Sequence, residues 1–207
     1  MTTAIGRLDV IAEGARRATV TRTTRETDVT VSLDLDGSGI AEISTGVGFY
    51  DHLLSSLAHH ALFDLTIRAS GDLEVDDHHT VEDVTLVLGS ALAEALGDRS
   101  GIGRFGDATV PMDESVATAI VDVGGRPYAV IDLPFRGERA GELTLQLVEH
   151  ALEAFARTSG TTLHVHGSGR NDHHLAEAAF KAVARALRAA VEPDPRRRGV
   201  PSTKGST

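Results

Sequence analysis

A six-residue element, Asp-His-His followed by two residues and a glutamate, occurs twice in this sequence. Residues 77–82 read Asp-His-His-Thr-Val-Glu, and residues 172–177 read Asp-His-His-Leu-Ala-Glu. Each copy opens an apolar run at helical spacing, which predicts a helix. On a helix, a histidine and a glutamate three or four positions apart share a face, whereas adjacent histidines point about 100° apart. Imidazole and carboxylate both bind metals, so one such helix end could serve two metal ions.

Aligning the two copies selects candidate ligands. His78, His79 and Glu82 match residues 95 positions later, and upstream His52 matches His150 at an offset of 98. Asp76 faces an asparagine and Asp83 an alanine, so neither acid is matched. Four histidines also lack a counterpart, namely His59, His60, His164 and His166. The eight matched residues, three histidines and one glutamate per half, are His52, His78, His79, Glu82, His150, His173, His174 and Glu177.

Six imidazoles and two carboxylates divide naturally into two metal sites of three nitrogens and one oxygen. Octahedral coordination would leave two positions open at each ion, and open positions suit catalysis better than structure. The ligand types allow manganese, iron, cobalt, nickel or zinc. Asp77 and Asp172 stand where helix N-caps belong, so we expect them to cap the two helices.

Composition excludes several classes of protein. The chain of 207 residues carries a net charge of -10, which argues against a nucleic-acid surface. It contains no cysteine, so disulfides, thiolate ligands and a cysteine nucleophile are excluded. No apolar run is long enough to span a membrane and no signal pattern opens the chain, so we expect a cytoplasmic protein.

The elements that must position these residues repeat in order. Each half reads β-β-β-α-β-α, which predicts an α+β fold with two four-stranded sheets and packed helices. We expect a weakly ordered lead-in at 1–14, a first half at 15–98, a second half at 99–192 and a C-terminal tail at 193–207. The expected helices are 49–61 and 81–96 in the first half, and 143–156 and 175–191 in the second. The expected strands are 16–25, 28–36, 39–44 and 63–69, then 104–110, 116–123, 128–133 and 161–166.

The motifs together resemble one enzyme family. Residues 46–54 (Gly-Val-Gly-Phe-Tyr-Asp-His-Leu-Leu), both Asp-His-His elements and residues 201–205 (Pro-Ser-Thr-Lys-Gly) are similar to imidazoleglycerol-phosphate dehydratases. The resemblance covers about 16–205 and includes Met112-Asp113-Glu114 and residues 168–171 (Ser-Gly-Arg-Asn). It implies a duplicated fold like the second domain of ribosomal protein S5. It also implies a large homo-oligomer of about 24 chains, with active sites between subunits.

The resemblance further implies a reaction, a cofactor and residue roles. The reaction is the dehydration of imidazole glycerol phosphate to imidazole acetol phosphate in histidine biosynthesis, with two Mn(II) ions per site held by the eight matched residues. The substrate ring would pass through a metal-bound imidazolate and a diazafulvene-like intermediate. Glu26 is expected to donate a proton to the leaving group and Glu177 to act as base, while Asp113 matches another active-site acid. The residues that match phosphate-binding positions are Arg104, Arg126, Lys181, Ser202 and Lys204.

Two alternatives come from other classes. A dinuclear metallohydrolase would use a bridging hydroxide against a small phosphorylated substrate. Such sites more often contain several carboxylates, whereas matched nitrogens outnumber matched oxygens three to one here. A metal-storage or metal-scaffolded assembly protein would need no catalysis, and the phosphate-matching residues weigh against it.

Overall fold

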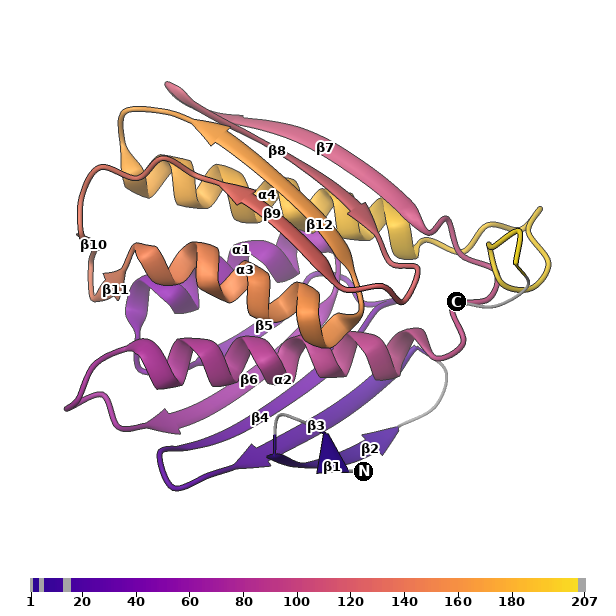
Figure 1. The fold of residues 1–207 in the computed structure, drawn as a ribbon, viewed down its shortest axis with the longest axis horizontal. Helices are drawn as coiled ribbons and strands as arrows, with labels where there is room; N and C mark the ends of the chain where they lie inside the picture. Colours follow the sequence, from indigo (N-terminus) through magenta and orange to yellow (C-terminus); the bar gives the residue numbers. More distant parts are fainter. Residues whose placement is uncertain (1, 4–5, 13–15, 205–207) are drawn as a thin grey trace.

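In the described part of the chain, four helices lie between a six-stranded and a four-stranded β-sheet (Figure 1). The structure is a computed structural model, and it describes residues 2–3, 6–12 and 16–204. Helix α2 packs on the first sheet and α4 on the second, while α1 packs against α4 and α3 against α2. The helices are α1 (Gly48–Ala61), α2 (His78–Leu96), α3 (Gln146–Ser159) and α4 (Asp172–Val191).

The duplication predicted from the motifs is confirmed by the strand order. The first sheet contains the series β3-β4-β6-β5 and the second sheet is β7-β8-β12-β9, with the last pair of each series parallel. The first-half strands are β3 (Arg17–Thr23), β4 (Thr27–Asp34), β5 (Ala41–Ser44) and β6 (Asp64–Gly71). The second-half strands are β7 (Phe105–Met112), β8 (Ser115–Asp122), β9 (Tyr128–Asp132) and β12 (Thr162–Ser168). The α+β fold with two four-stranded units is therefore correct.

Strict alternation in β4 shows why the sheets face the helices. Val29 and Val31 are fully buried and Leu33 is 4% exposed, whereas Thr30 and Ser32 between them point to the outer face. Successive side chains of a strand point to opposite faces, so the sequence itself sets which face receives the helices. The resulting core lies between the sheets and continues through both halves of the chain.

Close helix packing depends on small residues. Helix α4 buries seven alanines, among them Ala182 and Ala186 at 0% exposure. A side chain at Gly106 of β7 would collide with the carbonyl oxygen of Ala186, so this glycine allows α4 to approach the sheet closely. No helix in the described part of the chain is long and apolar enough to cross a membrane.

Two local features differ from the prediction. The described part of residues 1–14 forms strands, β1 (Thr2–Thr3) and β2 (Gly6–Ala12), where a weakly ordered lead-in was expected; residues 1, 4–5 and 13–15 lie outside the described residues. Strand β2 pairs with β3, but its neighbouring residues Asp9, Val10 and Ile11 are all exposed, so no buried face imposes an alternating pattern on the sequence. Helix α3 starts at Gln146 instead of residue 143, because β11 (Leu143–Thr144) pairs with β10 (Arg139–Ala140).

Candidate metal centre and active site

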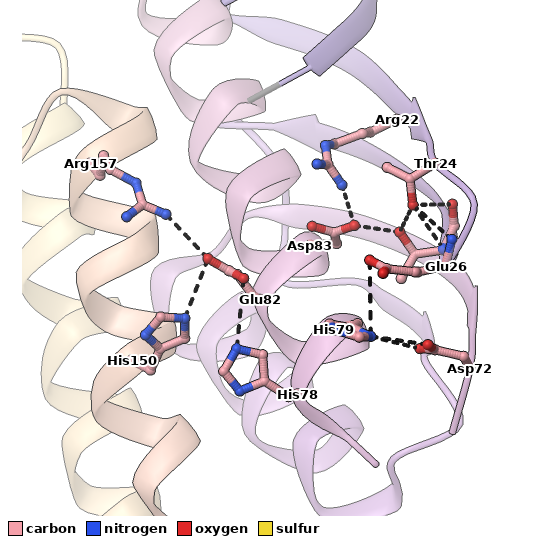
Figure 2. A network of polar contacts seen from close by, with 11 residues as sticks. Arg22, Thr24, Glu26, Asp72, His78, His79, Glu82, Asp83, His150 and Arg157 are labelled. Carbon is pink, nitrogen blue, oxygen red and sulfur yellow. Dashed lines mark hydrogen bonds and ion pairs between the residues drawn. The ribbon is translucent and has the colours of Figure 1, made fainter. Parts of the chain in front are cut away.

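Helices α2 and α3 bring together one group of candidate ligands (Figure 2). His78, Glu82 and His150 each offer one ligand atom, and these three atoms lie within 4.8 Å of one another. The Glu82 carboxylate is 3.8 Å from His78 Nε2 and 3.4 Å from His150 Nε2. His78 and Glu82 share a face of α2 because they are four residues apart. The separation of these atoms is one that a single metal ion can bridge.

Helices α1 and α4 build the equivalent second group. His173 Nε2 and His52 Nε2 lie 3.0 Å and 3.2 Å from the same oxygen of Glu177, and these residues meet the same 4.8 Å limit. Glu177 is 5% exposed, and the ring of Phe49 stacks against His173 with centroids 4.4 Å apart. The duplication that matched the residues in sequence therefore also matches them in space.

Each group takes ligands from both halves of the chain. His52 of the first half joins His173 and Glu177 of the second, and His150 of the second half joins His78 and Glu82 of the first. This exchange follows from the packing of α1 against α4 and of α3 against α2. Neither half could form a group by itself.

The second histidine of each pair points elsewhere. His79 Nδ1 lies 3.0 Å from an oxygen of Asp72, and His174 Nδ1 lies 2.9 Å from an oxygen of Glu114. Each histidine donates a hydrogen bond to its carboxylate, which raises the pKa of His79 and of His174, and the bond that Glu114 accepts from His174 holds the pKa of Glu114 well below its usual range. A carboxylate on Nδ1 leaves Nε2 as the nitrogen available to a metal.

Asp72 and Glu114 are site residues that the sequence reasoning missed. They come from different places, Asp72 from the loop after β6 and Glu114 from the β7–β8 turn, so aligning the halves could not pair them. Glu114 lies in the Met-Asp-Glu segment already noted, which was its only signal. Arg157 was also missed, and its Nη2 atom lies 3.4 Å from Glu82 Oε1.

The predicted acids Glu26 and Asp113 occupy equivalent hairpin turns. Glu26, in the β3–β4 turn, has an oxygen 4.0 Å from His79 Nδ1, and Asp113, in the β7–β8 turn, has one 3.9 Å from His174 Nδ1. Their side chains are 56% and 80% exposed. Each acid therefore lies beside the histidine of its His-His pair that belongs to neither three-residue group, namely His79 for Glu26 and His174 for Asp113.

Capping by Asp77 and Asp172 was a wrong prediction. Asp76 accepts a hydrogen bond of 2.8 Å from the backbone N–H of His78, and Asn171 accepts one of 3.0 Å from that of His173. Asp77 makes no side-chain cap bond, and Asp172 is already the first residue of α4. Asn171 is the N-cap of α4, and Asp76 lies one residue before the N-cap position of α2. Both aspartate carboxylates are therefore available for other contacts.

Lys181 forms an ion pair with Glu177, the carboxylate of the second group. Lys181 Nζ lies 2.7 Å from Glu177 Oε2, one helical turn along α4, and also donates to the sulfur of Met112 at 3.4 Å. Burial alone would raise the pKa of Glu177, but the hydrogen bonds from Lys181 and His52 outweigh it, and the pKa is lowered. The Glu177 carboxylate is therefore held in the ionised form that metal binding requires.

Other predicted phosphate-binding residues lie at the opposite end of the molecule, where α4 ends. Arg104 pairs with Asp122 at 2.7 Å and donates to the carbonyl of Pro201 at 2.7 Å, which places it beside the tail that carries Ser202 and Lys204. The backbone N–H of Arg104 donates to Ala190, near the end of α4. Helix α4 has 20 residues and so spans roughly 30 Å. Within one chain, these residues are not brought to the metal groups, which lie where α4 begins (Figure 1).

Arg126 also lies away from the metal groups. Its carbonyl oxygen accepts a hydrogen bond of 2.9 Å from Thr162, at the start of β12, and its side chain is exposed. Arg126 follows the Gly124-Gly125 turn, and a side chain at Gly124 would collide with the Arg104 guanidinium. Both arginines therefore belong to the same end of the molecule.

The donor set fits a divalent metal. His150 Nε2 is buried and has no hydrogen-bond partner within the part of the chain that the structure describes, although Glu82 lies 3.4 Å away without hydrogen-bond geometry. A buried polar atom without a partner is costly, and a metal ion would satisfy it. The fold and the two groups define a class: a duplicated α+β protein with two equivalent groups of residues that could hold metal ions.

Comparisons with known proteins give the family. The model of the imidazoleglycerol-phosphate dehydratase family matches residues 45–187. A dehydratase of this name from Dinoroseobacter shibae is 54% identical over 193 residues, covering 92% of this chain and 99% of that protein. The chain therefore belongs to the imidazoleglycerol-phosphate dehydratase family, and this membership makes it a lyase of histidine biosynthesis.

Solved structures agree with this assignment. The imidazoleglycerol-phosphate dehydratase from Pyrococcus furiosus superposes with a TM-score of 0.78 at 36% identity, covering 90% of this chain and 99% of that one. The enzyme from Staphylococcus aureus gives 0.77 at 35% identity, covering 84% and 98%. The resemblance noted in the motifs is thus confirmed over nearly the whole chain.

Proposed function

We propose that this chain dehydrates imidazole glycerol phosphate to imidazole acetol phosphate with two Mn(II) ions per active site. The observation that carries the proposal is the pair of equivalent His-His-Glu groups, each assembled from both halves of the chain. An imidazole substrate has two ring nitrogens, and two such groups offer one metal position for each. Bound divalent ions would act as Lewis acids, holding the ring as an imidazolate that can expel the hydroxyl through a diazafulvene-like form.

The geometry supports one division of the eight candidate ligands between the metal ions. Each group supplies two nitrogens and one oxygen, and His79 and His174 point away from both groups. We propose that these two histidines complete the groups of neighbouring chains, giving each ion three nitrogens and one oxygen. Asp72 and Glu114 would then fix the tautomer and ring orientation of the donated histidines.

The proton-transfer role falls more naturally on Glu26 than on Glu177. One oxygen of Glu177 faces His52 and His173 and the other faces Lys181, so both are engaged. The lowered pKa of Glu177 also makes it a weaker base. Glu26 has an exposed carboxylate beside His79, where it would meet a substrate bound to the metal ion that this histidine completes. Asp113 occupies the equivalent position beside His174 and supports the same chemistry or substrate binding.

Phosphate binding requires more than one chain. Lys181 lies on the ligand face of α4, whereas Arg104, Arg126, Ser202 and Lys204 lie at the far end of the molecule. We propose that the far end of one chain meets the metal end of another, so that active sites form between subunits of a large homo-oligomer. This arrangement supplies cations for the substrate phosphate in a protein that is acidic overall.

The deciding experiment incubates the purified protein with Mn(II) and imidazole glycerol phosphate and identifies the product. Imidazole acetol phosphate is expected. Release of inorganic phosphate would instead support the metallohydrolase, and an absence of any product would support a metal-storage or scaffold protein.

A substitution tests the phosphate contact. Lys181→Ala should raise KM for imidazole glycerol phosphate more than it lowers kcat, because Lys181 is proposed to bind the phosphate. The assay uses saturating Mn(II), so that the lost contact between Lys181 and Glu177 does not empty the second group. Arg188→Ala, exposed on the same helix, is the matched control and should leave KM unchanged. An unchanged KM in Lys181→Ala would remove this residue from the phosphate site.

A further inference from the structure

The connection between β9 and α3 is longer than its counterpart. In the first half only residues 45–47 separate β5 from α1, whereas residues 133–145 separate β9 from α3 and include the β10–β11 hairpin. We call residues 133–145 the clasp segment. In Figure 1 it runs along the edge of the molecule where α2 and α4 begin. It has no counterpart in the first half, so the duplication gives no reason for it.

The clasp segment contacts the start of α2 through Asp77. The backbone N–H of Thr144 donates to Asp77 Oδ2 at 2.6 Å, and the Thr144 hydroxyl donates to Oδ1 at 2.8 Å. Arg139 approaches the same carboxylate at 3.3 Å, and Asp77 is only 5% exposed. Asp77 directly precedes His78, and Thr144 stands two residues before α3, which carries His150. These bonds therefore join the two helix ends that supply the first group.

The same segment contacts the start of α4 through Asp172. The backbone N–H groups of Arg136 and Gly137 donate to the Asp172 carboxylate at 3.1 Å and 2.7 Å. Asp172 directly precedes His173. The two aspartates that the duplication matched thus bind opposite ends of one segment, instead of capping their own helices.

A third contact reaches α1. Gly141, at φ +58°, lies so close to the helix start that an added side chain would come within 3.4 Å of Phe49 Cβ. Phe49 in turn stacks on His173 at 4.4 Å. The clasp segment therefore touches the surroundings of both groups.

We propose that the clasp segment sets the spacing of the metal-ligating histidines, with Asp77, Thr144 and Asp172 as positioning residues. Metal–ligand distances tolerate deviations of only about 0.2 Å, so helix ends that carry ligands must be held firmly. Hydrogen bonds to a charged carboxylate are the strong kind, and the Asp77 carboxylate that receives two of them belongs to a residue only 5% exposed. Backbone N–H groups at the starts of α2 and α4 donate to Asp76 and Asn171, so the carboxylates of Asp77 and Asp172 are available to the clasp segment. The proposal rests on the metal site of the proposed function.

The test removes one hydrogen bond without touching a ligand. Thr144→Val deletes the hydroxyl that binds Asp77, and Thr144→Ser restores it. Thr109→Val is the matched control, because it also deletes a hydroxyl bond of 2.8 Å, to Thr118 on the exposed sheet face. Mn(II) affinity of each full-length assembled protein is measured by competition with a chelator, and thermal unfolding of the metal-free protein is recorded alongside.

Thr144→Val is expected to weaken binding of at least one Mn(II) ion about tenfold, as outer contacts of metal sites do. Thr144→Ser and Thr109→Val should bind as the unchanged protein does. An unchanged Mn(II) affinity in Thr144→Val, or an equal loss of affinity in Thr109→Val, would overturn the proposal that the clasp segment sets the ligand spacing. If Thr144→Val does not fold, Arg139→Gln takes its place, because Arg139 is an exposed partner of Asp77. This variant should weaken Mn(II) binding about twofold. An unchanged Mn(II) affinity in Arg139→Gln would then overturn the proposal. Failure of the unchanged protein to bind Mn(II) would refute the proposed function instead.

Discussion

Removing the Asp83 carboxylate should destabilise the protein and displace the Glu26 turn. Asp83, on α2, is 8% exposed and receives hydrogen bonds from the Arg22 guanidinium and the Thr27 hydroxyl (Figure 2). Thr24 accepts bonds of 3.1 Å and 3.0 Å from the backbone N–H groups of Glu26 and Thr27. The hairpin turn that presents Glu26 is therefore held against α2 by this one carboxylate.

The magnitude follows from burial. Asp83→Ala removes the carboxylate that pairs with the Arg22 guanidinium, and the Arg22 side chain is only 14% exposed. Breaking a buried pair in this way costs about 3 kcal/mol, at the lower end of the usual range because the arginine keeps some contact with water. In a chain of this size, that cost lowers Tm by roughly 6 to 12 °C.

Thermal unfolding and steady-state kinetics test this prediction together. Asp83→Ala should also lower kcat, because Glu26 loses its position. The double variant Arg22→Met with Asp83→Leu should recover most of the stability, since it removes both charges. Glu94→Ala, exposed on the same helix, is the control and should change neither property. A Tm within 2 °C of the unchanged protein, or a double variant as unstable as the single one, would refute the reasoning.

Three further predictions concern packing, pH and histidine orientation. Gly89→Ala should lower the free energy of unfolding by about 1 to 3 kcal/mol, measured by urea titration, because the new methyl would lie 2.8 Å from the carbonyl oxygen of Phe155 and push α2 from α3. Backbone hydrogen bonds from residues 38–40 lower the pKa of Asp64, so this carboxylate stabilises the fold above its unfolded pKa of about 3.9 and loses that effect as pH falls through the lower folded value. The stability gap between the unchanged protein and Asp64→Asn should accordingly narrow from pH 6 to pH 3, and a constant gap would contradict it. Asp72→Asn should lower the pKa of His79 in the metal-free protein, followed by NMR titration, and an unmoved pKa would show that Asp72 does not orient the ring.

Much of the fold could be predicted because the two halves of the chain repeat the same residue types in the same order. Alternating Val29 and Val31 set the buried face of β4, and matched positions of His52 and His150 identified helices that carry ligands. The alignment could not show that His52 joins the second-half residues. Equivalence between halves says which residues correspond, whereas packing of α1 on α4 decides which residues meet.

Local hydrogen bonding explains the other differences. Asp77 stands at an N-cap position, and nothing in the sequence distinguishes it from Asp76 one residue earlier as the cap. The Asp77 carboxylate accepts a hydrogen bond from Thr144, which lies 67 positions away, and only the folded structure shows this contact. Asp72 likewise stands in a polar loop, and its role depends on contact with His79. Contacts between segments far apart in sequence are what the periodicity of a single chain cannot encode.

The central claim is that each chain supplies the ligands for two metal ions. The direct measurement is the metal content of the assembled protein after removal of bound metal and reconstitution with Mn(II), compared with the His78→Ala variant. The structure predicts close to two ions per chain in the unchanged protein, with a lower content and lost dehydratase activity in the variant. A protein that dehydrates its substrate while holding no metal ion, or a His78→Ala variant with full metal content and activity, would contradict the account.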